Sequence, residues 1–109
     1  MIYDAKPYGI KVRFASTERM ARYLCRRFKA EWLDGCLGLT TWAEDGSIIL
    51  AVLDGKRATL VHECTHAALF VMEHVGIDPF ASNGEPMAYL LDSMYTACEN
   101  SLQRDGKGR

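Results

Sequence analysis

The stretch that decides the fold of this 109-residue chain lies between residues 56 and 75 and reads KRATLVHECTHAALFVMEHV. Apolar residues occupy most sides of the helix that this pattern predicts, so we expect the helix to be central and buried. Gly76 follows it and suits a helix C-terminus. Within the stretch, two of the chain's three histidines stand four residues apart, in the run His62-Glu63-Cys64-Thr65-His66.

The segments around this helix predict two further helices and a small sheet. The boundaries of these elements follow from three patterns in the sequence. These are alternation of apolar and basic residues, recurrence of apolar residues at every fourth position, and turn residues between short apolar runs. The expected elements, in chain order, are a strand at 10–14, a helix at 18–32, strands at 37–42 and 47–53, the helix at 56–75 and a last helix at 85–102. This order predicts a single α+β domain over residues 1–102 with a mainly antiparallel sheet, followed by a flexible polar tail over residues 103–109.

Composition narrows the classes of function. The net charge is −1, which gives no reason to expect binding to nucleic acid or to an anionic membrane surface. The longest wholly apolar runs have six residues, far short of the ~20 that cross a bilayer. The four cysteines are widely spaced and are expected to be reduced thiols. With no secretory signal in the first residues, the pattern predicts a cytoplasmic protein.

The histidine pair carries the clearest chemical signal. Residues four apart project from the same helix face, so His62 and His66 can each point one ring nitrogen at a single zinc ion. Glu63 lies about 100° further around the helix. From there its carboxylate can take a proton from a zinc-bound water without binding the metal itself. The other interpretation is that the two histidines pack or cap within the helix.

A catalytic zinc ion needs a third protein ligand. Glu73 and His74 lie too far along the helix axis from His66 to share the ion. We expect Glu85, at the start of the last helix, to be the third ligand, although Ser82 to Glu85 also fits a helix capping box. Asp78 and Asp92 remain alternatives.

Two neighbouring residues have two interpretations each. Tyr89 lies one turn after Glu85, where it can donate a hydrogen bond to the oxyanion of a tetrahedral intermediate or simply pack at the core edge. Cys64 points away from the face of His62 and His66, so it is interpreted as a small buried apolar side chain rather than a ligand.

The motif at residues 62–66, followed by Ala67-Ala68-Leu69 and later by Glu85, resembles the zincin metallopeptidases, with the glutamate typical of their gluzincin branch. The short chain is similar to the SprT-like and ImmA/IrrE-like minimal zincins, small proteins that are often encoded by phages or prophages. The resemblance covers about 45 residues. It implies a zinc-dependent peptidase with Glu63 as general base, Zn²⁺ on His62, His66 and Glu85, and a protein or peptide substrate.

The resemblance also implies that an edge strand of the sheet lies beside the cleft and pairs with an extended substrate. We expect that strand within residues 47–53. The chain departs from the gluzincin pattern at Tyr89, where an acidic residue often supports a zinc-bound histidine, a role that Asp92 would have to take.

Two other classes of function remain open. A catalytically inactive, zincin-like binding or regulatory module would use a basic stripe on the first helix to dock an acidic partner or phosphates. The stripe consists of Arg19, Arg22, Arg26 and Lys29, which can also form a simple solvated helix face. The presence of Glu63 favours catalysis over this alternative. A small accessory protein with an accidental motif would bind no metal.

Overall fold

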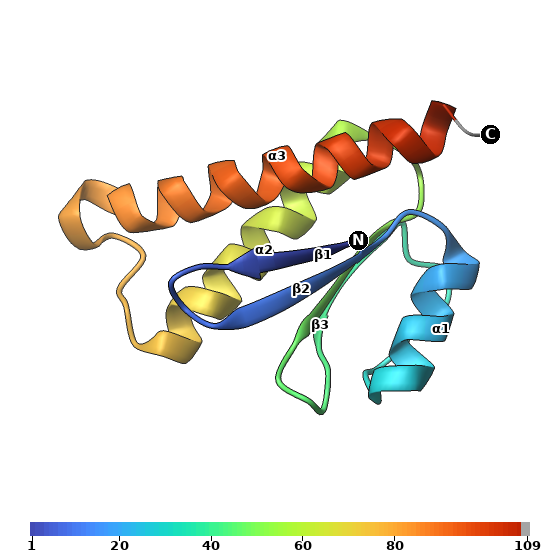
Figure 1. Ribbon diagram of the computed structural model, residues 1–109, viewed down its shortest axis with the longest axis horizontal. Coiled ribbons are helices and arrows are strands. Elements are labelled where there is room, and N and C mark those ends of the chain that lie inside the picture. Colours follow the sequence, from blue (N-terminus) through green and yellow to red (C-terminus); the bar gives the residue numbers. More distant parts are fainter. Residues whose placement is uncertain (108–109) are drawn as a thin grey trace.

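The computed structural model describes residues 1–107 and contains one mixed four-stranded sheet with helices on both faces (Figure 1). The elements are β1 (Ile2–Ala5), β2 (Ile10–Ala15), α1 (Glu18–Phe28), β3 (Gly38–Trp42), β4 (Ile48–Val52), α2 (Arg57–Val75), a short 3-10 turn η1 (Ala81–Gly84) and α3 (Glu85–Lys107). The α+β class is confirmed. None of the helices within residues 1–107 is long and apolar enough to span a membrane.

The strand order in the sheet is β1-β2-β4-β3. β1 pairs with β2 and β3 pairs with β4 in antiparallel fashion, whereas β2 and β4 run parallel. The sheet is therefore mixed, and two of its three pairings are antiparallel, as the expectation of a mainly antiparallel sheet requires. β1 was not expected from the sequence, because its four residues carry no turn signal or alternation strong enough to mark a strand.

β4, the inner strand between β2 and β3, organises the core. All five of its residues are buried, because one face is covered by α2 and α3 and the other by α1. Ile48, Leu50 and Val52 belong to the larger core with the α2 and α3 side chains, while Ile49 and Ala51 pack with residues of α1. The run Ile-Ile-Leu-Ala-Val is typical of a strand buried on both faces.

The edge strand beside α2 is β3, so the expectation that residues 47–53 form this edge is wrong. β3 pairs with β4 on one side and has no second strand neighbour within residues 1–107. Its sequence contains Thr40 and Thr41, and each of its residues is only partly buried. A strand with a continuous apolar run is typical of the inside of a sheet, and a strand with polar residues is typical of its edge. This is the physical reason why β3, and not β4, lies at the edge.

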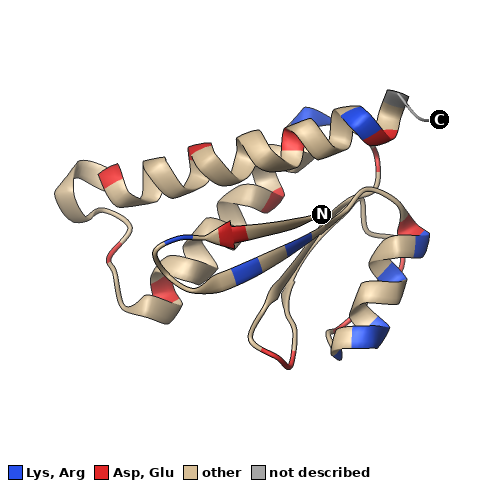
Figure 2. Cartoon of the chain, viewed as in Figure 1, with Lys and Arg blue, Asp and Glu red and all other residues tan. Residues whose placement is uncertain are grey.

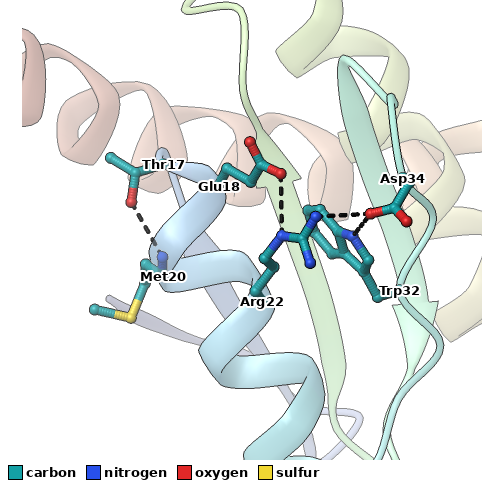
Figure 3. Close-up of polar contacts among 6 residues, drawn as sticks. All are labelled: Thr17, Glu18, Met20, Arg22, Trp32 and Asp34. Carbon is teal, nitrogen blue, oxygen red and sulfur yellow. Dashed lines mark hydrogen bonds and ion pairs between the residues drawn. The ribbon is translucent and has the colours of Figure 1, made fainter.

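α1 is shorter than its apolar periodicity suggested. Thr17 accepts a hydrogen bond from the Met20 backbone N–H at 3.2 Å and caps the first turn (Figure 3). The helix ends at Phe28 because Lys29 adopts the left-handed conformation. Trp32, which was expected on the helix, lies beyond it and packs beside Leu24 and other residues on the α1 face of the sheet.

α3 extends further than expected. Residues 103–107, predicted to belong to a polar tail, continue the helix, and the Asp105 carboxylate accepts a hydrogen bond from Ser16 at the end of β2. The rest of the predicted tail, residues 108–109, lies outside the described part of the chain.

Candidate functional site: the histidine pair and the sheet edge

The first turn of α2 is fixed by Asp54, which precedes it. The Asp54 carboxylate accepts hydrogen bonds from the Thr59 hydroxyl at 2.6 Å and from the Lys56 backbone N–H at 3.1 Å. The hydrogen bond from Thr59 is the main reason why the pKa of Asp54 lies below its usual value. The hydrogen bond from the Lys56 N–H gives a partner to a backbone donor that has none within the helix. Together, the two hydrogen bonds to Asp54 orient the start of the helix that carries the motif.

The two motif histidines lie together on the exposed face of α2. The Nε2 atoms of His62 and His66 are 3.2 Å apart, and the rings meet edge to face with centroids 4.7 Å apart. Two nitrogens bound to one tetrahedral zinc at ~2.0–2.1 Å are themselves about 3.3 Å apart. The pair therefore fits two adjacent corners of a tetrahedral metal site, and it can also share a proton between the two rings.

Glu63 turns from this face toward the sheet. It is 7% exposed, and the Thr40 hydroxyl on β3 lies within hydrogen-bonding distance of two of its oxygens: Oε1 of the carboxylate at 2.7 Å and the backbone carbonyl at 3.1 Å. A buried carboxylate without a donor would be costly. Thr40 thus fixes the orientation of Glu63 and joins the motif helix to the edge strand.

Gly38 allows the edge strand to approach this carboxylate. A Cβ placed on Gly38 would lie 2.8 Å from Glu63 Oε2 and 2.8 Å from Thr59 Cγ2, closer than real Cβ contacts. The residue is therefore a glycine for reasons of space. Sequence analysis missed both Gly38 and Thr40, because neither forms a local motif and both act through a contact across about 23 residues of chain.

A shallow depression of about 450 Å³ opens beside Glu63. It is bounded by the start of β3 and by the first two turns of α2, with Leu37, Gly38, Ala58, Thr59, His62 and Glu63 as its lining. One wall is apolar and the other carries His62 and the carboxylate. Figure 2 shows that α2 has no Lys or Arg beyond its first turn, so this part of the surface holds no fixed cation from the helix itself.

The structure does not bring the expected third ligand, Glu85, to the histidines. α3 does fold back against α2, but its C-terminal half reaches the motif: Cys98 hydrogen-bonds Cys64, and Glu99 pairs with Arg57 at 2.9 Å. Glu85 is exposed at the first residue of α3, about 20 Å along the helix axis from Cys98. The antiparallel packing of the two helices places it at the wrong end.

The alternative ligands lie apart from the pair as well. Asp78 is exposed beyond the end of α2 and accepts a hydrogen bond from the Phe80 backbone N–H at 2.9 Å. Asp92 is exposed on α3. Among residues 1–107, no three His, Cys, Asp or Glu side chains form a group that could hold a metal ion. The described chain therefore supplies two of the three ligands that a catalytic zinc site uses.

Tyr89 and Cys64 also have defined positions. Tyr89 is 72% exposed and lies nine residues before Cys98 on α3, about 13 Å along the axis, so it does not reach the histidine pair. Cys64 is fully buried. Its hydrogen bond with Cys98 and its burial raise the pKa of the Cys64 thiol well above the usual value. The thiol therefore stays protonated and serves as a small core side chain.

The basic stripe of α1 is partly neutralised by its own neighbours. Arg22 pairs with Glu18 at 3.0 Å and with Asp34 at 2.7 Å (Figure 3). Its guanidinium also lies 4.9 Å from the centre of the Trp32 ring. These contacts tie α1 to the segment that follows it, so Arg22 has a structural role on this surface.

A scan against models of known protein families, a search of curated proteins and a search of solved structures each found no match to this chain.

Proposed function

We propose that the chain is a metal-dependent peptide hydrolase of zincin-like design, with its centre at His62, Glu63 and His66. The observation that supports this most directly is the buried Glu63 carboxylate, which Thr40 holds beside a histidine pair of metal-ligand spacing. A helix that only packed against the sheet would have no need of a buried carboxylate at this position.

The histidines would hold the metal through Nε2, and zinc bound there would supply a Lewis acid and an acidified water. Glu63 would accept a proton at its carboxylate from water in the adjacent depression and return that proton to the leaving amine. The Thr40 hydroxyl would keep one carboxylate oxygen in place and leave the other available. The third ligand must come from outside the groups described in residues 1–107.

The free edge of β3 supports a peptide as the substrate. Leu37 O accepts from Leu53 N, and Ala43 N donates to Ser47 O, both at 2.8 Å. Since alternate residues of an antiparallel ladder direct their backbone groups to opposite sides, the N–H and C=O groups of Gly38, Thr40 and Trp42 point away from β4. An extended peptide can pair with these groups and pass the Glu63 carboxylate.

A second candidate, a zincin-like module that binds peptide without cleaving it, is favoured by one observation: no third ligand joins the histidine pair in residues 1–107. This candidate retains the β3 edge as a binding surface. It differs from the hydrolase in predicting that the unaltered chain and Glu63→Gln both bind peptide and that neither cleaves it.

The deciding experiment is the metal content of protein purified without a metal-binding tag, measured by elemental mass spectrometry, followed by a cleavage assay on a mixture of proteome-derived peptides. The hydrolase proposal expects about one zinc per chain, lost in His66→Ala and retained in Glu63→Gln, together with cleavage that Glu63→Gln abolishes. Absence of metal in the purified protein, with no uptake of added zinc, would overturn it.

A further inference from the structure

A cluster of three aromatic rings lies further along the same edge of the sheet. The proposed roles of the histidine pair and of Glu63 do not involve it. The Trp42 ring on β3 stacks on the Phe70 ring of α2, with centroids 5.6 Å apart and planes 10° apart. The His74 ring lies 5.4 Å from the Trp42 ring at an angle of 47°. We call Trp42, Phe70 and His74 the aromatic shelf.

The shelf continues the line of the histidine pair on α2. His62, His66, Phe70 and His74 follow one another at intervals of four residues, and each step turns the row by about 40° around the helix, from the exposed face at His62 toward the sheet. On β3, Gly38, Thr40 and Trp42 face the side of α2 that Glu63 and Phe70 occupy, next to the histidine pair. The shelf and the proposed catalytic centre therefore belong to one continuous strip between α2 and the edge strand.

The spacing along this strip is set by the strand. Trp42 is two residues beyond Thr40, which corresponds to about 7 Å along β3. Gly38, Thr40 and Trp42 are also the residues whose backbone groups point to the open edge. A peptide strand added there presents every second side chain to the α2 side. A side chain that reaches the shelf is thus two residues away from the one that passes Thr40 and Glu63.

We infer that the aromatic shelf is a side-chain subsite that takes an aromatic or large apolar residue of an extended peptide added to β3. Trp42 and Phe70 are only partly buried and His74 is exposed, so ring surface remains open to a partner. Aromatic rings stack favourably in offset or edge-to-face geometry, and burying an apolar side chain on them adds affinity. The inference deepens the proposed function, on which it rests for the identity of the occupant.

The chain offers a direct reporter of this contact. It has two tryptophans, Trp32 and Trp42, and Trp32→Phe leaves the shelf residue as the only indole. The probes are two capped eight-residue peptides of threonine and lysine that differ at one central position, phenylalanine in one and alanine in the other. The protein also carries Glu63→Gln, so that binding is measured without turnover.

We expect the phenylalanine peptide to bind roughly tenfold more tightly than the alanine peptide and to change the emission of Trp42. Phe70→Leu, which keeps an apolar side chain in the core but removes the stacked ring, should reduce that preference at least threefold, a modest loss for one aromatic pair. Equal affinity for the two peptides, an unchanged Trp42 emission on binding, or no binding up to about 1 mM would each overturn the inference.

Cleavage is measured separately, with the chain carrying Glu63, so the two proposals can fail independently. Selective binding of the phenylalanine peptide without metal-dependent cleavage supports the shelf and overturns the hydrolase. Cleavage that Glu63→Gln abolishes, with no preference for an aromatic residue two positions from the cut bond, supports the hydrolase and overturns the shelf.

Discussion

The hydroxyl oxygen of Thr40 lies 2.7 Å from Oε1 of Glu63, and this contact joins the edge strand to the motif helix. Within residues 1–107, it is the hydrogen bond that links the Glu63 carboxylate on α2 to β3. The orientation of the proposed base therefore depends on a residue 23 positions away in the sequence.

Thr40→Val tests that dependence, because valine keeps the shape of threonine and removes its hydroxyl. The Glu63 carboxylate would be left buried without this donor, and we expect a loss of about 1–3 kcal/mol in the free energy of unfolding, measured by urea denaturation. Thr41→Val is the matched control, since Thr41 faces the opposite side of the strand. An equal loss in both variants would mean that the hydroxyl of Thr40 has no special role.

Gly38→Ala tests the close approach of β3 to α2. The added methyl group would meet Glu63 and Thr59, and the overlap should cost about 1–3 kcal/mol and reduce any cleavage by displacing the carboxylate. Gly106→Ala in α3 is the control, because a Cβ at that position meets nothing within 4 Å. That control should leave stability unchanged or raise it by up to about 1 kcal/mol. If Gly38→Ala were as stable as the unaltered chain, the strand would have room that its contacts do not indicate.

The three histidines provide a matched set for the metal. Zinc at a hundredfold excess over its Kd should stabilise the unaltered chain by about 2.7 kcal/mol, observed as a rise in the melting temperature. His62→Ala and His66→Ala should each abolish the rise because each removes one of the paired nitrogens. His74→Ala, on the same helix but outside the pair, should retain it. A loss of the same size in His74→Ala would place the metal elsewhere on α2.

Acid should weaken the start of α2 through Asp54. Its folded-state pKa is lowered, mainly by the hydrogen bond from Thr59. This contribution to stability is therefore fully present above the unfolded value of about 3.9 and is lost as the pH falls through the folded value. Thr59→Val should make the free energy of unfolding depend less on pH in that acid range, whereas Thr59→Ser should keep the dependence. Urea unfolding between neutral pH and pH ~2.5 measures the difference, and identical profiles for the two variants would contradict the assignment.

Much of the fold could be predicted from local patterns. The motif helix follows from its apolar residues and from Gly76, and its observed range, Arg57–Val75, differs by one residue from the expected start. The strand at β4 follows from its apolar run. What local patterns could not supply was the neighbour of each strand. The parallel pairing of β2 with β4 and the position of β3 at the edge depend on which faces α1 and α2 cover.

In the candidate site, too, local spacing predicted some features, and others depended on how the elements pack together. Spacing alone placed His62 and His66 side by side, because a helix fixes the separation of residues four apart. Spacing could not place Glu85, since its distance from the pair depends on how far α3 slides along α2. The contacts of Cys98 with Cys64 and of Glu99 with Arg57 show what that offset is. Thr40 and Gly38 escaped notice for the same reason, because their roles arise only when β3 packs against α2.

The two sides of the strip between α2 and β3 differ in how firmly they are held. α2 follows the buried strand β4 after only residues 53–56 and is clamped by Asp54 at its start, by the core along one side and by α3. Within residues 1–107, β3 pairs with another strand along one edge alone, and its other support is the packing of its side chains on α2. A peptide that adds to its open edge would extend the sheet by a strand and stiffen the element that carries the Thr40 hydroxyl. Binding of a substrate would then restrict the motion of Thr40 and hold the Glu63 carboxylate more firmly in its orientation. Substrate binding and the positioning of the proposed base would therefore be coupled.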